Sequence, residues 1–294
     1  MTSFQDNNKR KQPSKAARKR VKETFEPKDL ATICVEQDFS DYATKVELSP
    51  WGQRERFYWH QDNGSEILAV AHLDTVQADT RCSVTHTSAG WLAASGGLDD
   101  RLGVYVILEM LPKLGIKCDW LLTTDEESCR STAEDFETDK QYRWMIEFDR
   151  GGTDVVMYQY ETQQARELVE DSGSRVGNGS FSDIAALEHL GCVGFNWGVG
   201  YQDYHSQRSH AWLEDTFRMV ARFEKFYRVN SELSLPHSYD DRWGYGKWEW
   251  EWDKDGSLLM VADCGHEVDL NDNRTYIEIE GGRLVTCFKC GNHE

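Results

Sequence analysis

Acidic residues and histidines stand where the hydrophobic runs of this sequence end. The run EILAVAHLD ends at His72 and Asp74, LLTTDEES ends at Glu126 and Glu127, and WMIEFDRGG ends at Asp149. Imidazole and carboxylate groups are ligands for zinc, cobalt and manganese, and a spare carboxylate beside such ions can act as a general base. These residue types favour metal-assisted hydrolysis of an amide or peptide bond.

Two further segments carry residues of the same types. The segment GGLDDRLGV places Asp99 and Asp100 at the entrance of a helical pattern over 102–111, and a fourth hydrophobic run, CVGFNWGVG, is followed by His205. Capping of a helix explains one aspartate at such an entrance better than it explains two. His210 is an alternative to His205 as a ligand.

The carboxylates are numerous enough to matter electrostatically. Asp125, Glu126 and Glu127 are adjacent, and three neighbouring carboxylates repel one another unless cations neutralise them. A solvated turn is the alternative for this element alone. So many oxygen ligands suit two divalent ions better than one, either two Zn²⁺ or Co²⁺ or Mn²⁺ in their place.

The elements that position these residues can be predicted from hydrophobic periodicity. Short apolar runs alternate with helical patterns, which is typical of a mostly parallel twisted sheet flanked by helices, an α/β fold. Because ligands gather outside the carboxyl ends of parallel strands, we expect the acids and histidines to converge. The expected strands are 67–71, 120–123, 143–148 and 192–197, and the expected helices are 102–111, 164–171, 182–190 and 212–227.

Charge is distributed unevenly along the 294 residues. The net charge is −18, yet residues 1–22 hold eight basic residues and one acid, which leaves −25 for the remainder. So acidic a body repels phosphate backbones and argues against nucleic acid as the main ligand. No stretch has the roughly 18 apolar residues of a membrane span, and no apolar segment follows the basic N-terminus, so we expect a cytoplasmic protein that is neither membrane-bound nor secreted.

Composition divides the chain into four parts. Residues 1–24 are basic and lack apolar periodicity, which predicts a disordered arm. Residues 25–234 are expected to form the catalytic domain, 235–256 a Trp-rich linker, and 257–294 a small β-rich zinc-ribbon-like module. Five cysteines are scattered through the larger domain and are expected to be reduced.

The C-terminal part contains a second possible metal site. Cys264 and His266 precede the pair Cys287 and Cys290, which has Cys-x-x-Cys spacing. Four such ligands predict one structural Zn²⁺ that would fold a segment too small for its own core. Unliganded thiols are the alternative, and His293 could replace His266.

The five motifs of the larger domain together resemble the clan of co-catalytic di-zinc exopeptidases and deacylases, which includes bacterial aminopeptidases, peptidase T and desuccinylases. The resemblance rests on AHLDTV (71–76), GGLDDRLGV (96–104), TTDEES (123–128), EFDRGG (147–152) and DYHS (203–206), in that order. It implies that His72 and Asp149 bind one zinc, that Glu127 and His205 bind the other, and that Asp99 bridges the two.

The same resemblance implies roles for the neighbouring groups. Glu126 would be the general base, Asp74 would orient His72, and the segment 179–183 (GSFSD) would line the substrate pocket. Many members of the clan insert a lid or dimerisation domain before the final histidine, but only 55 residues separate Asp149 from His205. We therefore expect the compact form of the fold, without a lid-domain dimer.

These observations predict a zinc-dependent metallopeptidase, most simply an aminopeptidase on short peptides. An N-acyl amino acid deacylase or amidase of the same clan is the first alternative. A non-catalytic protein that binds partners through its zinc ribbon is the second. Asp125, Asp154 and Asp183 are the acids that could recognise the free α-amine of a peptide substrate.

Overall fold

The computed structural model describes residues 12–50 and 55–238, together with the backbone of five short strands between 259 and 293. The chain divides into two compact units, Met1–Tyr239 and Asp240–Glu294. The first unit contains all the motifs of the predicted catalytic site. It is the unit described in detail below.

A seven-stranded sheet forms the centre of the first unit, in the spatial order β1-β2-β6-β3-β7-β9-β8. The four inner strands β6, β3, β7 and β9 run parallel, and antiparallel strands complete both edges. The prediction of a mostly parallel sheet is confirmed. The strands are β1 (Thr44–Glu47), β2 (Phe57–Gln61), β3 (Ile67–His72), β6 (Asp119–Thr123), β7 (Trp144–Glu147), β8 (Val155–Val156) and β9 (Gly194–Trp197).

The order of the parallel strands reverses at β3. From β3 the chain crosses to β6 on one side, and it then continues on the other side of β3 with β7 and β9. Such a reversal opens a crevice at the carboxyl ends of the strands, where ligands bind in open α/β sheets. All six residues of β3 are buried, which fits a central strand covered on both faces. His72, at the carboxyl end of β3, therefore lies at the reversal.

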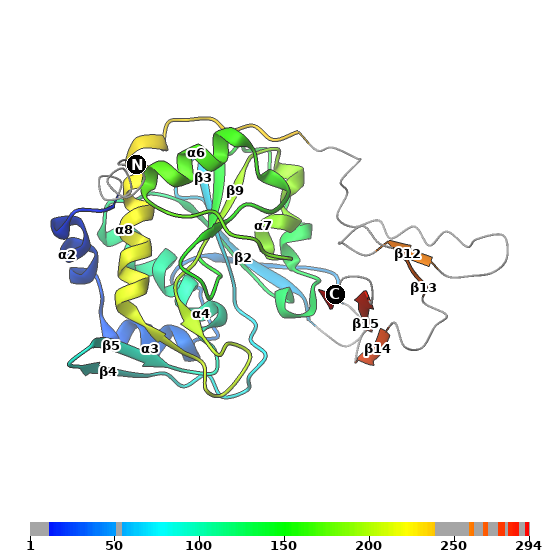
Figure 1. The fold of residues 1–294 in the computed structure, drawn as a ribbon, viewed down its shortest axis with the longest axis horizontal. Helices are drawn as coiled ribbons and strands as arrows, with labels where there is room; N and C mark the ends of the chain where they lie inside the picture. Colours follow the sequence, from blue (N-terminus) through cyan, green and yellow to red (C-terminus); the bar gives the residue numbers. More distant parts are fainter. Residues whose placement is uncertain are drawn as a thin grey trace, which may run out of the picture. The chain divides into compact units, whose positions relative to one another are not determined.

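Helices cover both faces of the sheet (Figure 1). On one face, Phe195 of β9 packs edge-on against Phe226 of α8 (Leu213–Asn230). On the other face, a side chain at Gly194 would meet Ile184 of α7 (Asp183–Ala186). Because successive strand residues point to opposite faces, these two contacts assign α8 and α7 to opposite sides of β9.

The helix after β3 begins at the GGLDDRLGV motif. It comprises α4 (Leu98–Tyr105) and continues through a π-helical segment, η1 (Val106–Met110), into α5 (Leu111–Lys113). The other helices are α2 (Lys15–Glu23), α3 (Pro27–Val35), α6 (Gln163–Ser172) and the 3₁₀ turns η2 (Glu126–Ser128), η3 (Thr132–Asp135), η4 (Tyr158–Tyr160) and η5 (Glu188–Leu190). The segment expected to be one helix over 182–190 is thus the short α7 followed by η5.

A smaller antiparallel sheet, in the order β10-β11-β5-β4, joins two of the motifs. Its strands are β4 (Ser83–Thr87), β5 (Gly90–Ala94), β10 (Tyr201–Gln202) and β11 (His210–Trp212). The pairing of β11 with β5 places His210 opposite Ala94, just before the GGLDD segment. The C-terminal end of the loop that carries His205 is therefore paired with the strand that leads into α4.

The prediction of a disordered arm over 1–24 is wrong for its second part, because Lys15–Glu23 forms helix α2. Ser14 caps this helix by accepting a hydrogen bond from the backbone N–H of Ala17, and Val21 is completely buried. Arg20 forms an ion pair of 2.6 Å with Glu224 of α8. These tertiary contacts stabilise a helix whose other residues are mostly polar. Residues 1–11 lie outside the described residues.

The first unit also extends further than the predicted boundary at 234. The backbone N–H of Leu235 donates to the carbonyl of Arg143, and Leu235 is buried. Pro236 pairs with Cys192 in an isolated bridge, so the chain still follows the sheet at this point. The expected linker therefore starts after these residues, and 239–256 lie outside the described part.

The second unit is described only as strands: β12 (Leu259–Val261) pairs with β13 (Glu267–Asp269), and β14 (Tyr276–Ile279), β15 (Gly282–Cys287) and β16 (Asn292–His293) form a second small sheet. Cys264, His266 and Cys290 lie outside the described residues, and so does the side chain of Cys287. The structural zinc site stays a prediction. Among the described residues, no helix has the length and hydrophobicity needed to cross a membrane.

Candidate metal centre

His72 presents one ring nitrogen toward the carboxyl edge of the sheet. Its Nδ1 lies 2.9 Å from the backbone carbonyl of Asp74. A carbonyl can only accept a hydrogen bond, so Nδ1 carries a proton and Nε2 is the ring nitrogen left for a metal ion. Nε2 is buried without a hydrogen-bond partner, although buried polar atoms normally have one. This is the arrangement of a histidine that ligates a metal through Nε2.

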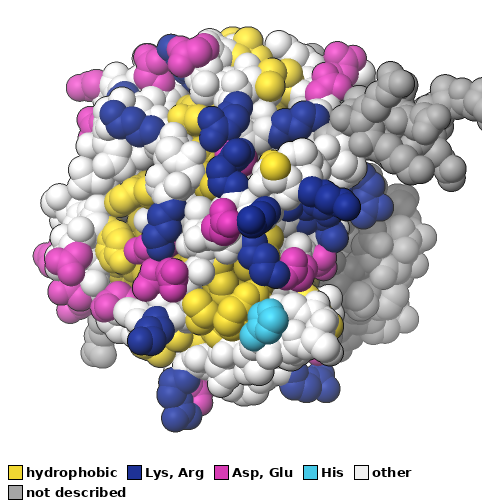
Figure 2. All heavy atoms as spheres, turned by 90° about the vertical axis from the view of Figure 1, so that its left-hand side faces the viewer, with side chains coloured by type: hydrophobic (Ala, Val, Ile, Leu, Met, Phe, Trp, Pro, Cys, Tyr) yellow, Lys and Arg dark blue, Asp and Glu magenta, His cyan; other side chains and the backbone are white. Residues whose placement is uncertain are grey.

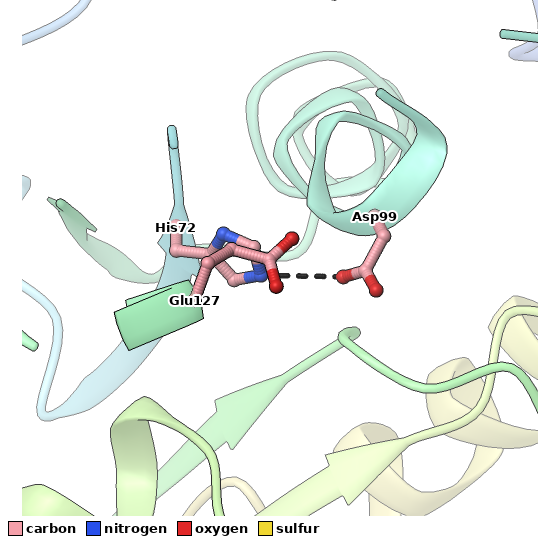
Figure 3. A group of neighbouring side chains, drawn as sticks. All are labelled: His72, Asp99 and Glu127. Atoms are coloured by element: carbon pink, nitrogen blue, oxygen red, sulfur yellow. Dashed lines mark ion pairs between the residues drawn. The ribbon is translucent and has the colours of Figure 1, made fainter. Parts of the chain in front are cut away.

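Asp99 lies between the two histidines. Its Oδ1 is 3.3 Å from Nε2 of His72, and its Oδ2 is 3.1 Å from Nε2 of His205. Asp99 stands at the start of α4, where the backbone has not yet become helical, so its side chain points to the strand ends instead of along the helix. Figure 3 shows His72 from β3, Glu127 from η2 and Asp99 from α4 converging on one point.

Glu127 and His205 form the second half of the cluster. Oε2 of Glu127 is 2.9 Å from Nε2 of His205. Ligand atoms of His72, Asp99 and Glu127 all lie within 4.8 Å of one another. His205 has a φ of +57° and its side chain is 47% exposed, so this half of the cluster is open to solvent where the His72 half is closed.

Asp149 belongs to the His72 half. Its Oδ1 is 3.8 Å from Nε2 of His72 and accepts a hydrogen bond of 2.7 Å from the hydroxyl of Tyr201. The same hydroxyl is 3.3 Å from Oδ1 of Asp99. Asn196 of β9 holds the backbone of Asp149 on both sides, because its amide accepts from the N–H of Asp149 and donates to its carbonyl.

Glu126 approaches the cluster but is held differently from Glu127. Its Oε2 is 3.8 Å from Nε2 of His72. The carboxylate of Asp74 accepts hydrogen bonds from the backbone N–H groups of Glu126 and Glu127, at 3.3 and 3.2 Å. Asp74 therefore orients His72 through its carbonyl and supports the Glu126–Glu127 turn through its carboxylate. We expected the carboxylate itself to orient His72, but it is 3.6 Å from Nδ1.

The electrostatics of the cluster are those of a site for cations. Hydrogen bonds to Asp99 and Glu127 raise the pKa of His205 to about 10. Burial opposes a charge on His72, but its interactions with Asp149, Asp74 and Asp99 outweigh this and raise its pKa well above the usual value. Burial, together with Asp149 and other carboxylates, raises the pKa of Glu126 to about 9. In the absence of metal ions, bound protons offset the negative charge of the cluster. Divalent cations would displace these protons and neutralise the carboxylates in their place.

A layer of fully buried acids lies beneath the cluster. Asp183 accepts a hydrogen bond from the hydroxyl of Thr123, Glu147 accepts one from Ser182, and neither oxygen of Asp100 has a hydrogen-bond partner. Burial is the main cause that raises the pKa of all three acids. A side chain at Gly103 would lie 2.3 Å from Oδ1 of Asp100, so only glycine fits there.

The structure brings the predicted site residues of the first unit together. These are His72, Asp74, Asp99, Glu126, Glu127, Asp149 and His205. His210 is elsewhere, in β11, where its Nδ1 lies 2.9 Å from the carbonyl of Arg208. Of the acids considered for amine recognition, Asp125 lies 3.7 Å from Arg56, Asp154 is paired with Arg150, and Asp183 is buried.

Three supporting residues were missed by sequence reasoning: Tyr201, Asn196 and Gln77. The side chain of Gln77 donates a hydrogen bond of 2.9 Å to the carbonyl of His205, and Gln207 donates to Gln77. Tyr201 and Asn196 lie in or just after the hydrophobic run that precedes His205, so their position at a strand end was the available signal. Gln77 has no such signal because it acts across 128 residues of sequence.

The donor set fits two divalent metal ions of the zinc class. It offers two imidazole nitrogens and several carboxylates, with no cysteine among the described residues of the cluster. The free Nε2 of His72 and the unpartnered Oε1 of Glu127 are buried polar atoms that a cation would satisfy. His72, Asp99 and Asp149 would hold one ion, and Asp99, Glu127 and His205 the other.

Comparison with protein-family models gave no match, and comparison with curated proteins gave none either. Solved structures do match. A tripeptidase from Staphylococcus aureus is 10% identical, with a TM-score of 0.51, over 73% of this chain and 98% of that one. Aminopeptidase PepT from Bacillus cereus is 11% identical, with a TM-score of 0.46, over 71% and 98% of the two chains. A Zn-dependent exopeptidase from Parabacteroides distasonis is 12% identical, with a TM-score of 0.41, over 74% and 91%. At these identities, the similarity to the tripeptidase shows a shared fold and no more.

Proposed function

We propose that this chain is a two-metal, zinc-dependent exopeptidase, and that it acts as an aminopeptidase on short peptides. The observation that carries the proposal is the position of Asp99, whose two carboxylate oxygens face the Nε2 atoms of two different histidines at 3.3 and 3.1 Å. A carboxylate in this position can bridge two cations. The fold shared with a tripeptidase supports the same proposal. The cluster also lies at the carboxyl edge of the parallel strands, where ligands bind in open α/β sheets.

The residues of the site supply the remaining parts of a hydrolytic mechanism. Two bound zinc ions would polarise the scissile carbonyl and lower the pKa of a shared water. Glu126 lies beside the cluster without an ion pair to His205 among the described residues, so its carboxylate can take the proton of the attacking water and pass it to the leaving amine. The carboxylate of Asp74 holds Glu126 in this position by accepting a hydrogen bond from the backbone N–H of Glu126.

The test combines metal content with a substrate panel on the full-length protein. Elemental mass spectrometry should show that Asp99→Ala binds about two zinc ions fewer per chain than the unaltered protein, since both ions depend on Asp99. Alanine tripeptides, aminoacyl amides and N-acetylated amino acids are the substrates. Glu126→Gln should lower kcat by about 10²–10⁴ and keep the metal content, as expected for a general base. Glu134→Gln, an exposed acid in η3, is the matched control and should leave both unchanged.

Three results would contradict the proposal at different levels. Cleavage of N-acetylated amino acids without cleavage of any free aminoacyl substrate would replace the aminopeptidase by a deacylase of the same mechanism. Binding of one metal ion or none at the Asp99 cluster would remove the two-metal site on which the proposal depends. Full turnover by Glu126→Gln in a pure preparation would disprove the assigned general base.

A further inference from the structure

Four arginines from three separate segments lie close together on the face formed by α2, α6 and α8. Arg18 belongs to α2, Arg218 and Arg222 lie one helical turn apart on α8, and Arg175 follows the end of α6. Helices α2 and α6 both pack against α8, which brings the three segments together. Figure 2 shows Lys and Arg side chains gathered on the face that lies at the left of Figure 1, where α2 and α8 are.

Hydrogen bonds locate the centre of this arginine cluster (Arg18, Arg175, Arg218 and Arg222). Nη2 of Arg222 donates to Oε1 of Gln12 at 2.9 Å, and Nε2 of Gln12 donates to the carbonyl of Gly173 at 3.0 Å. Arg175 follows Gly173 by two residues, so one bridging amide links the α8 arginine to the turn that carries Arg175. The partner of Arg222 is thus a neutral amide, and a carboxylate does not take this position.

The positive charges of the cluster are poorly compensated. Within the described residues, Arg18, Arg175 and Arg222 form no ion pair with a carboxylate, whereas Arg218 is paired with Asp215. Burial, followed by the charges of Arg218, Arg175 and Arg18, lowers the pKa of Arg222 to about 10. The negative charge of Asp215 opposes this decrease, but its effect is smaller than each of the others. Asp154, which is also near Arg175, is bound by Arg150 at 2.7 Å.

Neighbouring guanidinium groups repel one another, and this repulsion costs free energy unless an anion lies between them. Such a concentration of these groups is also out of keeping with a chain whose net charge is −18. The charges of Arg18, Arg175 and Arg218 all act on the guanidinium of Arg222, so the cluster suits a compact group with more than one negative charge. Guanidinium groups bind phosphate oxygens through pairs of parallel hydrogen bonds.

We propose that Arg18, Arg175, Arg218 and Arg222 form a binding site for a phosphate group, either free phosphate or the terminal phosphate of a small phosphorylated molecule. The site is separate from the metal centre and does not depend on the proposed peptidase activity. Since it lies across α2, α6 and α8, an anion bound there ties the N-terminal helix to the body of the fold.

The test is calorimetric titration of the full-length, metal-loaded protein with inorganic phosphate and with ADP, at constant ionic strength set by NaCl. We expect saturable binding of one anion per chain and a rise in Tm with anion concentration. Arg175→Gln and Arg222→Gln should each weaken binding by about tenfold or more, because each removes a charge-assisted hydrogen bond. Arg166→Gln, an arginine of α6 that is already paired with Glu161, is the matched control and should bind normally.

The two anions distinguish the source of the phosphate. Equal affinities place recognition in the phosphate group alone, and tighter binding of ADP shows that a nucleoside part is also recognised; both support the site. Arg175 is exposed, so its variant keeps the test valid even if replacement of the half-buried Arg222 destabilises the fold. Absence of binding at about 10 mM of either anion would overturn the proposal. Binding that both arginine variants retain and that disappears when the metals are removed would also overturn it, since phosphate would then be held by the metal centre.

Discussion

The backbone carbonyl of Asp74 accepts the Nδ1 proton of His72 at 2.9 Å, while the nearer carboxylate oxygen of Asp74 is 3.6 Å from the same nitrogen. One residue therefore has two separate tasks. Its main chain selects the His72 tautomer, and its side chain accepts the N–H groups of Glu126 and Glu127. A substitution of the side chain should affect only the second task.

Asp74→Asn should consequently lower kcat and the affinity for the metal ion held by Glu127 and His205. The affinity for the ion held by His72 and Asp149 should not change. The two carboxylate oxygens of Asp74 accept hydrogen bonds from two backbone N–H groups. In the asparagine variant the amide NH₂ would face one of these donors, so the Glu126–Glu127 turn would lose one of its two supporting hydrogen bonds. Loss of such a supporting partner typically weakens metal binding by about 10–100-fold. Competition with a chelator of known affinity measures the two sites in turn. Selective loss of the ion at His72 and Asp149 would show that the carboxylate orients His72 after all.

Tyr201→Phe tests the hydroxyl that contacts both Asp149 and Asp99. Removal of one hydroxyl leaves the buried ring in place but takes away the 2.7 Å hydrogen bond to Asp149, so the fold should persist. We expect zinc affinity to fall by about 10-fold or more and kcat to fall with it. Tyr204→Phe is the control, because Tyr204 is 54% exposed and the variant keeps the ring that packs against Tyr201 and His205. An unchanged affinity in Tyr201→Phe would mean that Asp149 keeps its orientation without the hydroxyl.

The part of this site that could be predicted from the sequence is the part that follows hydrophobic strands. His72, Glu126, Glu127 and Asp149 stand at or just after the ends of β3, β6 and β7, and buried strands are recognised by continuous apolar runs. Strands β1, β2, β4 and β5 were not predicted. They are short and only partly buried, so their sequences lack a continuous apolar run.

Helix α2 was missed for a related physical reason. Its own sequence is basic and offers one completely buried residue, Val21, so its stability comes from the surface of α8. Gln77 was missed because it acts on the backbone of His205, which is 128 residues away in the sequence. Contacts of this kind depend on the finished fold, and no local pattern announces them.

Gln77→Ala tests whether the exposed half of the centre depends on the hydrogen bond to the carbonyl of His205. His205 and Asp203 both have positive φ values, so the loop needs external contacts to hold this shape. We expect the ion between Glu127 and His205 to bind about 10-fold more weakly, with no change at His72. Gln61→Ala is the matched control, because the side chain of Gln61 donates its hydrogen bond to the carbonyl of its neighbour Asp62. Equal loss at both metal positions would contradict a role limited to the His205 loop.

Asp183→Asn should stabilise the metal-free protein in a pH-dependent way. Burial raises the pKa of Asp183 to about 6, whereas the same group in the unfolded chain has a pKa of about 3.9. Between these values the unfolded chain has lost the proton and the folded protein still holds it, so the free energy of unfolding decreases as pH rises from about 4 to about 6. Above that range the penalty for the buried charge is complete. An asparagine carries no charge and still accepts the hydrogen bond from Thr123, so the variant escapes the penalty.

Urea unfolding of the chelator-treated protein between pH 4 and pH 7.5 measures this difference. The stability gained by Asp183→Asn should be small near pH 4, grow up to about pH 6 and then stay constant. Asp139→Asn, at an exposed position, should show a difference that does not change with pH. A gain from Asp183→Asn that is equally large at pH 4 and pH 7 would show that packing, and not the buried charge, distinguishes the two side chains. A gain that grows with pH would establish that the fold keeps an unfavourable acid beneath its metal centre.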